Sequence, residues 1–484
     1  MNPSASASAS RARYTVLAVL CSLAFLTYLD RICIMRVQED IERDLGFRQL
    51  LPEDEQHLRE AGHEFNLAAR EKLARDRATQ RMSWVFSAFL LGYLLFEIPA
   101  GWMGDRRGPR WVIVRIVVWW SLFTALTGSV TTIGRWLSAA PTTALFFGLM
   151  VLARFLFGLG EAGAYPNMAR ALGRWFPAWD RAGAQGTIWM SSRLGGAVAP
   201  MFIGALAGWA GWQRAFWILG LIGVLWAICF ACWFRDRPED HPRVNAAERE
   251  LIRADATGPN SIYDDTSQAA TPWGHLFSSF SLLALYTVSY SMSFCWYFFV
   301  TFLPKYFKEQ HGIDYAQSEI VSGLPLLVGA LACLAGGRLS DRLVTRLGSR
   351  RWGRNLPGIV GCALAAGCAL AATQLRSPWA CVLLICLAAA CQDVSLPCMW
   401  SVPVDVGGRH AGTVGGCMNS VGCVGGMLSP LVAARMSSAL GWTAVFFVFA
   451  AVYLLAALAW ACVDASRGMI EAEPTETFRS MTAE

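Results

Sequence analysis

Long apolar runs alternate with short polar connections along almost the whole chain. Each run has about the 20 residues that an α-helix needs to cross the hydrocarbon core of a bilayer. The pattern therefore predicts an all-α membrane protein with twelve transmembrane helices, at 14–35, 82–103, 111–133, 144–166, 185–209, 214–234, 279–303, 318–338, 356–374, 378–402, 411–435 and 442–463.

Arginines cluster in the connections after the second, fourth and eighth predicted spans, whereas the short connections between them carry little charge. Cytoplasmic loops of membrane proteins carry an excess of Lys and Arg. We therefore expect these three connections and both termini to lie in the cytoplasm, and the protein to be a multi-pass protein of the plasma (inner) membrane.

The spans group as six plus six around one long polar connection. The predicted units are a disordered cytoplasmic N-terminus at 1–13, a first six-helix half at 14–234, a central cytoplasmic loop at 235–274, a second six-helix half at 275–463 and a cytoplasmic tail at 464–484. The first half contains an unusually long external connection, 36–81, in which Pro52 suits the first turn of a short extracellular helix.

An acidic, arginine-containing turn occurs at matching positions of the two halves. After the second span it comprises Gly101, Asp105, Arg106, Gly108 and Arg110. After the eighth span it comprises Gly337, Asp341 and Arg342. Such repetition is typical of transporters built from duplicated halves, and we expect these residues to form a conformational motif.

The amino-acid composition excludes several classes of protein. The chain is 55% hydrophobic and 16% charged, which is too apolar for a soluble globular protein. The net charge of +6 is explained by loop arginines and does not indicate a nucleic-acid partner. The 15 cysteines stand mostly alone in apolar runs, and no catalytic or metal-ligand spacing occurs within the spans. We expect no enzyme activity, no metal and no cofactor.

Charged residues inside spans are costly, so each one is a candidate functional residue. They are Asp30, Arg31, Glu97, Arg154, Glu161, Arg193 and Asp393. Arg154 and Glu161 lie two turns apart on one helix face. In the first half, the two acids Asp30 and Glu161 could thus form ion pairs with the two arginines Arg31 and Arg154 when no substrate is bound.

This arrangement suggests a mechanism. An arginine fork matches a carboxylate geometrically, so an incoming organic anion could displace Asp30 or Glu161 from Arg31 or Arg154. The displaced acid, desolvated and without its partner, would take up a proton. Importing one negative charge costs about 2.3 kcal/mol per 100 mV, which coupled protons would offset. A fixed salt-bridge brace between the first and fourth spans is the alternative interpretation.

The remaining charges are less easily assigned. We expect Glu97 and Arg115 to join a structural charge network beside the Asp105 turn. Arg193 has no obvious acid on its own helix and could bind a second substrate carboxylate, and Asp393 could be its partner or a third titrating site.

Several motifs resemble those of a known family. The turn from Gly101 to Arg110 resembles the signature loop of the major facilitator superfamily. Three further motifs resemble its anion:cation symporter family: Tyr28-Leu29-Asp30-Arg31; Arg154-Phe155-x-x-Gly158-x-x-Glu161 with Tyr165-Pro166; and Trp400-x-x-x-x-Asp405 with Gly415-Gly416-Cys417-Met418-Asn419. The resemblance covers essentially all twelve spans.

The resemblance implies a role for each matching residue. Asp30 and Glu161 correspond to the proton-linked positions of the family. Arg31 and Arg154 correspond to the arginines that serve coupling and bind the substrate carboxylate. The positions that touch substrate are Tyr28, Tyr93, Trp400 and Asn419. This chain departs from the family at Arg193, and at Pro397 and Met399, where small polar residues are common.

We therefore expect a monomeric, proton-coupled symporter of a small organic anion, with a sugar acid such as a hexuronate or galactonate as the best candidate and Na⁺ as the other candidate cation. Two alternatives remain open. An exchanger of organic anions or phosphates on the same fold would need the arginines but no titrating acids. A membrane sensor would bind the ligand without transporting it.

Overall fold

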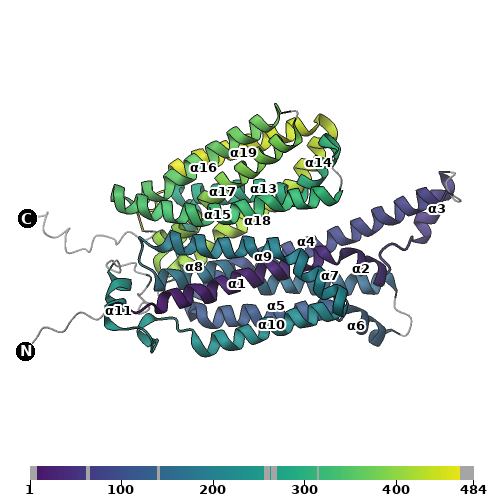
Figure 1. The fold of residues 1–484 in the computed structure, drawn as a ribbon. Helices are drawn as coiled ribbons and strands as arrows, with labels where there is room; N and C mark the ends of the chain where they lie inside the picture. The colour runs from purple at the N-terminus through teal and green to yellow at the C-terminus, as the bar shows by residue number, and fades with distance from the viewer. Residues whose placement is uncertain are drawn as a thin grey trace, which may run out of the picture.

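The computed structural model describes residues 8–61, 66–138, 142–254, 262, 270–312, 315–375 and 377–468. Within these ranges the regular structure is helical throughout. The predicted disordered N-terminus and the tail fall in large part outside the described residues, at 1–7 and 469–484. The helices form two packed groups, one from each half of the chain (Figure 1).

The first half begins with α1 and ends with α10. Its helices are α1 (Ala12–Arg36), α2 (Gln38–Asp44), α3 (Pro52–Glu60), α4 (Leu67–Arg107), α5 (Pro109–Gly128), α6 (Val130–Leu137), α7 (Thr143–Glu161), α8 (Ala164–Trp175), α9 (Arg181–Ala210) and α10 (Trp212–Trp233).

Three short helices lie in the connection between the halves, and the second half follows. The connection contains η1 (Pro238–Asp240), α11 (Ala246–Arg253) and α12 (Trp273–Ser278). The second half contains α13 (Phe280–Thr301), α14 (Leu303–His311), α15 (Tyr315–Leu347), α16 (Arg350–Ala372), α17 (Pro378–Gly407), η2 (Gly408–His410), α18 (Ala411–Leu440) and α19 (Trp442–Cys462).

Ten described helical stretches are long and apolar enough to cross a membrane. One of them, Pro378–Leu440, contains two spans, α17 and α18. A further long helix, α9, carries polar residues such as Gln185 and Arg193 that lower its hydropathy, and it packs between α1 and α15. The predicted fold of twelve transmembrane helices in two six-helix halves is confirmed.

The predicted fourth span, 144–166, is not one continuous helix. α7 ends at Glu161, and α8 begins at Ala164 after a turn through Gly163. Gly163 has φ +83°, a conformation that favours glycine. A Cβ on Gly163 would also lie only 2.3 Å from the Cβ of Ala100 on α4. Glycine therefore lets the chain turn immediately after Glu161, close against α4.

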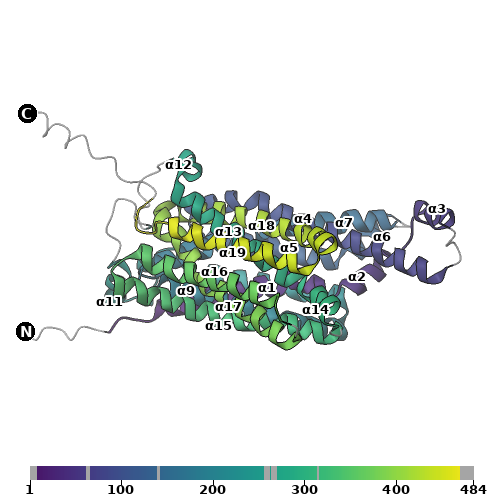
Figure 2. The ribbon, with the colours of Figure 1, turned by 90° about the horizontal axis from the view of Figure 1, so that it is seen from above.

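The two halves meet along two long helix pairs, α4 with α18 and α9 with α15. A Cβ on Gly101 of α4 would lie 2.2 Å from the carbonyl oxygen of Gly412. In the same way, a Cβ on Gly337 of α15 would lie 2.1 Å from the carbonyl oxygen of Ala182. Small residues thus allow the helix backbones of opposite halves to approach closely. Both contacts lie near the side where α1 starts and α19 ends, here called the termini side (Figures 1 and 2).

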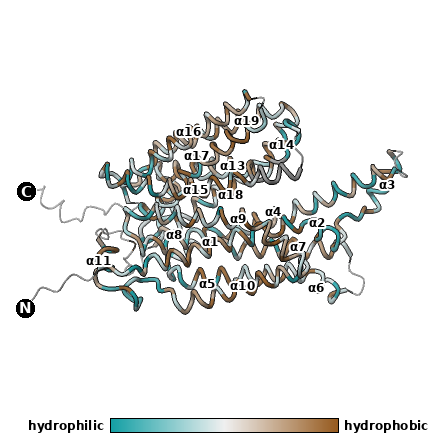
Figure 3. Tube along the Cα trace, viewed as in Figure 1, coloured by the Kyte–Doolittle hydropathy of each residue, from teal (hydrophilic) through white to brown (hydrophobic). Residues whose placement is uncertain are grey.

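The 36–81 connection forms more than the single short helix expected. It contains α2, α3 and the first turns of α4, which is 41 residues long. The Arg77 guanidinium contacts Asp54 of α3, and Arg81 donates to the carbonyl oxygen of Phe47. This part of the molecule is more hydrophilic than the bundle (Figure 3). On the bundle, leucines such as Leu122 and Leu458 remain 59% and 69% exposed, as expected for surfaces in contact with lipid.

Candidate functional site

The first ion pair of the site joins the first and fourth spans. Arg31 on α1 donates from Nε and Nη2 to Oε1 of Glu161, at 3.1 and 2.5 Å. The Glu161 side chain is 1% exposed, and the Arg31 side chain is 20% exposed. The second carboxylate oxygen of Glu161, Oε2, is buried without a hydrogen-bond partner among the described residues. The pair therefore uses only one of the two carboxylate oxygens.

Aromatic rings surround the Arg31 guanidinium. Its Cζ lies 5.5 Å from the ring centroid of Tyr28, 5.3 Å from that of Phe89 and 5.0 Å from that of Tyr93. Such rings attract a cation through their negative faces while excluding water. This cage, formed by α1 and α4, fixes Arg31 in an environment where an anion would bind strongly.

Asp30 and Arg154 are buried deeper, at 4% and 2% exposure. Oδ1 of Asp30 and Nε of Arg154 have no hydrogen-bond partner within the described part of the chain. Cζ of Arg154 lies 4.3 Å from the ring centroid of Phe157, and Asp30 interacts electrostatically with both Arg154 and Glu161. The four charges predicted for the first half are thus gathered together, but the direct ion pair that the structure forms among them is Arg31–Glu161.

A second ion pair joins the two halves. Arg193 on α9 donates from Nε and Nη2 to the two carboxylate oxygens of Asp393 on α17, at 2.9 and 2.8 Å. The Cζ of Arg193 lies 3.4 Å from the ring centroid of Trp296. Asp393 is thus a partner of Arg193, one of the two roles considered for it.

Tyr28 connects the two ion pairs. Its hydroxyl accepts a hydrogen bond from Nη1 of Arg193 at 3.2 Å, and its ring faces Arg31. The two guanidinium groups therefore contact the same side chain. A small molecule with two acidic groups could reach both.

Glu97 does not belong to the charge network expected beside the Asp105 turn. It is fully buried, and its Oε2 accepts from the backbone N–H of Gly163 at 2.7 Å. Its Oε1 accepts from Nδ2 of Asn419 on α18 at 2.8 Å, and the same amide lies 3.3 Å from the Tyr93 hydroxyl. Arg115 instead lies over the ring of Phe96, 5.1 Å from its centroid. Sequence spacing gave no signal for a contact that depends on the break after α7.

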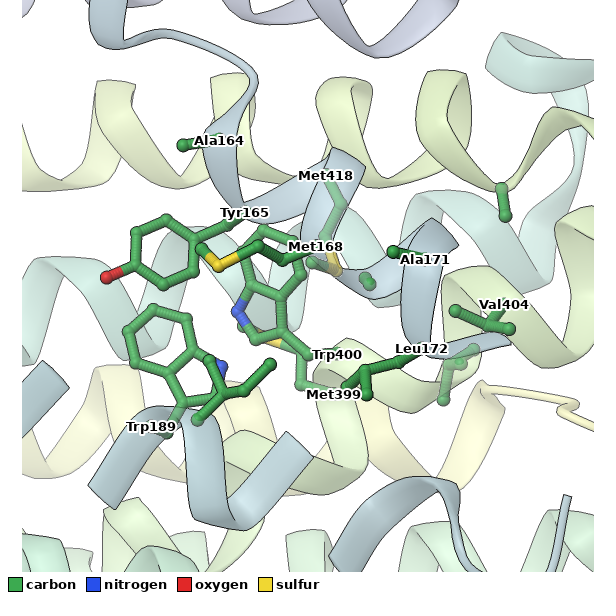
Figure 4. Packing of buried hydrophobic residues seen from close by; sticks show 14 of the residues in the cluster. Ala164, Tyr165, Met168, Ala171, Leu172, Trp189, Met399, Trp400, Val404 and Met418 are labelled. Atoms are coloured by element: carbon green, nitrogen blue, oxygen red, sulfur yellow. The ribbon is translucent and has the colours of Figure 1, made fainter. Parts of the chain in front are cut away.

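Trp400 lies in an aromatic cluster rather than standing free (Figure 4). Its ring centroid is 5.8 Å from that of Tyr165 and 5.7 Å from that of Trp189, and these two rings stack at 4.5 Å. Trp400 is 1% exposed. Met399, noted as a departure from the family pattern, is buried beside it (Figure 4).

On the termini side, the repeated acidic residues join the halves. Asp105 of α4 accepts from the backbone N–H groups of Gly412 and Thr413 at the start of α18, at 2.9 and 2.7 Å. Asp341 of α15 accepts from the N–H groups of Ala182 and Gly183 at the start of α9, at 3.2 and 2.6 Å. A carboxylate at a helix N-terminus satisfies free N–H groups and the helix dipole. Each repeat thus fastens one half to the other.

Arginines reinforce these contacts. Arg170 donates to Asp105 at 2.7 Å, and Arg354 donates to Asp341 at 2.7 Å and to Asp405 at 3.1 Å. Asp405 also accepts from Arg181 at 2.9 Å. From the sequence these loop arginines indicated only the orientation of the protein, and their ion pairs were not predicted. Arg170 is 65 positions from Asp105 and Arg354 is 13 positions from Asp341, so no local spacing indicated these ion pairs.

The other residues of the repeated turns have more local contacts. Gly108 has φ +81° and ends α4, and the backbone N–H of Arg110 donates to Asp236 at 2.8 Å. Arg106 lies over the ring of Trp102, 4.2 Å from its centroid, and Arg342 is exposed. The contacts of Arg106 and Arg110 are therefore local, and the contacts between the halves on the termini side come from Asp105 and Asp341.

The fold and the site define a class of protein. Two six-helix halves, with charged side chains buried in and between them, form a membrane transporter. Residues 20–430 match the family model of the Major Facilitator Superfamily. The chain belongs to this superfamily, which confirms the identification made from the sequence motifs.

Curated relatives support this assignment. The chain is 31% identical over 425 residues to the probable sulfoacetate transporter of Cupriavidus necator, covering 87% of this chain and 86% of that protein. It is 30% identical to the probable galactarate/D-glucarate transporter of Bacillus subtilis, covering 74% and 78%. Both relatives are named as transporters and not as enzymes, in agreement with the expectation from the sequence.

A solved structure shows the same fold. The human organic anion transporter MFSD10 superposes with a TM-score of 0.65 at 18% identity, covering 93% of this chain and 99% of that chain. At this identity the likeness concerns the fold alone.

Proposed function

We propose that the protein imports a small organic anion by alternating access, coupled to protons. The observation that carries this proposal is the Arg31–Glu161 pair in its aromatic cage. Arg31 is partly exposed, and Glu161 uses one oxygen only. An acidic group of the substrate would replace Glu161 on the guanidinium fork, because the fork fits any planar carboxylate.

Proton coupling follows from the fate of Glu161. Once displaced, its carboxylate would lose its bonded arginine, and two buried acids, Glu161 and Asp30, would be left near the single cation of Arg154, which is costly. A proton neutralises it, so substrate and proton binding favour each other. Asp30 is the second candidate proton site because it lies close to Arg154 and Glu161 and has an unpaired oxygen.

The substrate class proposed is a small diacid. The relatives are named for sulfoacetate and for galactarate and glucarate, and each of these compounds carries two acidic groups. In this chain Arg31 and Arg193 both contact Tyr28. A diacid or a sulfonated acid would therefore bind Arg31 with one group and Arg193 with the other, which favours a sugar diacid over the monoacids considered first.

Further roles follow from the same arrangement. Tyr28 and Tyr93 would contact the substrate from the cage, and Asn419 would contact it from the second half. Buried in its aromatic cluster, Trp400 would shape the site from behind. Arg106, Arg110 and Arg342 lie on the termini side, and this supports the proposal that the termini side faces the cytoplasm. The membrane would be the plasma (inner) membrane. The working unit would be a monomer.

Uptake into proteoliposomes tests the function. With an imposed inward pH gradient, labelled glucarate and sulfoacetate should accumulate, and a proton ionophore should abolish the accumulation. Glu161→Gln should lose accumulation but retain counterflow, while Glu71→Gln on the exposed external segment serves as the matched control. Accumulation by Glu161→Gln equal to that of the unchanged protein would exclude the coupling mechanism. Counterflow without any accumulation by the unchanged protein would identify an exchanger, and saturable binding without flux would identify a sensor.

A further inference from the structure

Glu97 is a buried acid that the mechanism above does not use. Both of its oxygens accept hydrogen bonds, from Gly163 and from Asn419. No arginine or lysine of the described chain lies within ion-pair distance of its carboxylate, in contrast to Glu161 and Asp393. A fully buried carboxylate without a cation is costly, so its counter-charge must come from elsewhere. A proton bound to the carboxyl group would neutralise it.

The position of Glu97 places it between the substrate site and the cytoplasm. On α4 it follows Tyr93, a member of the Arg31 cage, by one turn, and it precedes Asp105 by about two turns. At the end of the α4–α18 contact nearer the Arg31 cage, Asn419 donates to Glu97. At the end on the termini side, the N–H of Gly412 donates to Asp105. In this structure the contact is closed along that length.

Two connections link Glu97 to the Arg31–Glu161 pair. The N–H that Glu97 accepts belongs to Gly163, two residues after Glu161. The Asn419 amide that donates to Glu97 also contacts Tyr93. The titratable and charged groups facing Glu97 are Tyr93 on α4, Arg31 on α1, Glu161 on α7 and Cys423 on α18.

We propose that Glu97 is the residue that releases the transported proton to the cytoplasm. This inference rests on the proposed proton coupling. When the halves rock apart on the termini side, α18 withdraws Asn419 and the contact at Asp105 opens. Cytoplasmic water then reaches Glu97, its O–H bond breaks, and its proton leaves to that water. As substrate leaves to the cytoplasm, the Glu161 carboxylate returns to Arg31, and the proton that it gives up passes through water to the Glu97 carboxylate, which is neutral again when the contact closes.

The experiment separates internal from external pH. Initial uptake rates are measured in proteoliposomes while each pH is varied in turn. In the unchanged protein, uptake should quicken as internal pH rises. Glu97→Gln, which keeps an oxygen acceptor for the Gly163 N–H, should slow proton-driven uptake about 10-fold or more and lose the internal-pH dependence. Its external-pH dependence and counterflow should remain, and Glu97→Asp should restore part of the internal-pH response.

The outcomes are distinguishable. If Glu97→Gln slows uptake but keeps both pH profiles, Glu97 is structural and the inference fails while the proposed function stands. If the unchanged protein responds to neither pH, proton coupling itself fails. Should Glu97→Gln not fold, carbodiimide labelling of the unchanged protein decides, since carbodiimides modify protonated carboxyl groups in apolar surroundings. Mass spectrometry should find Glu97 labelled at low pH and progressively less labelled as pH rises; no label at low pH would overturn the inference.

Discussion

The two ion pairs at Tyr28 use the same chemistry in different settings. Arg31–Glu161 lies within the first half, uses one carboxylate oxygen and leaves its arginine side chain 20% exposed. Arg193–Asp393 crosses between the halves, uses both oxygens and is sealed, with side chains 3% and 0% exposed. A pair with a spare oxygen and partial exposure can exchange its partner. A sealed pair that uses both carboxylate oxygens holds two helices together, and a substrate acid must compete with Asp393 to reach Arg193.

The difference matters for alternating access. A transporter needs one contact that a substrate can replace and others that keep the halves in register until it does. Removing one partner of a buried pair leaves an uncompensated charge, whereas replacing both with apolar residues is often tolerated. Variants of the two pairs should therefore behave differently, and the following predictions test that contrast in order of expected effect.

The largest effect is expected at the sealed pair. Arg193→Met or Asp393→Leu alone should destabilise the protein by about 3–5 kcal/mol, because each leaves a buried charge without its partner. The double variant should recover most of that loss. Thermal unfolding in detergent measures it, and equal losses in the single and double variants would show that the pair is not the source of stability.

A smaller effect is expected at the exchangeable pair. Arg31→Lys should weaken substrate binding by about 2 kcal/mol, or roughly 30-fold, because the planar fork and its contacts with the cage are lost. Unfolding should change little, since a lysine keeps a cation near Glu161. Binding is measured by ligand-induced thermal stabilisation, with Arg48→Lys in the 36–81 connection as control. Unchanged affinity would place the substrate elsewhere.

A substrate with two acidic groups would contact the arginines of both ion pairs, and Asp393 would compete with it for Arg193. Asp393→Asn removes the acid that competes for Arg193 and keeps the size of the side chain. Affinity for a diacid should rise relative to affinity for the matching monoacid by about 5–10-fold, or about 1 kcal/mol. Competition against labelled substrate measures the ratio. If both acids gain or lose equally, Arg193 acts in packing and not in recognition.

The smallest effect is expected at the ion pair between Arg77 and Asp54, in the 36–81 connection. Burial acts to raise the pKa of Asp54, but the Leu51 N–H and the Arg77 guanidinium outweigh it, so the pKa lies below its ordinary value. Because the folded pKa is depressed, this stabilisation is present at neutral pH and is lost as pH falls through the folded value.

Asp54→Asn should accordingly destabilise α3 by roughly 1 kcal/mol at pH 7 and by less at acid pH, with uptake unaffected. Hydrogen exchange of the α3 amides measures this. An equal effect at both pH values would contradict the assignment.

Sequence reasoning succeeded where one local rule dominates. The apolar runs placed α10 and α19 within two residues of their observed bounds, Trp212–Trp233 and Trp442–Cys462, because a span must be apolar over its whole length. It failed at the fourth span, where the turn through Gly163 ends α7 inside the predicted run 144–166. The same break gave Glu97 a partner that no spacing rule could supply.

By itself the sequence determined the twelve spans, the duplicated halves and the short set of buried charges, because placing a charge in a membrane is costly enough to make each one conspicuous. Only the tertiary structure decided how those charges pair. Arg31 meets a residue 130 positions away, and Arg193 meets one 200 positions away. Such pairing depends on how helices cross, and crossing is set by packing over the whole bundle.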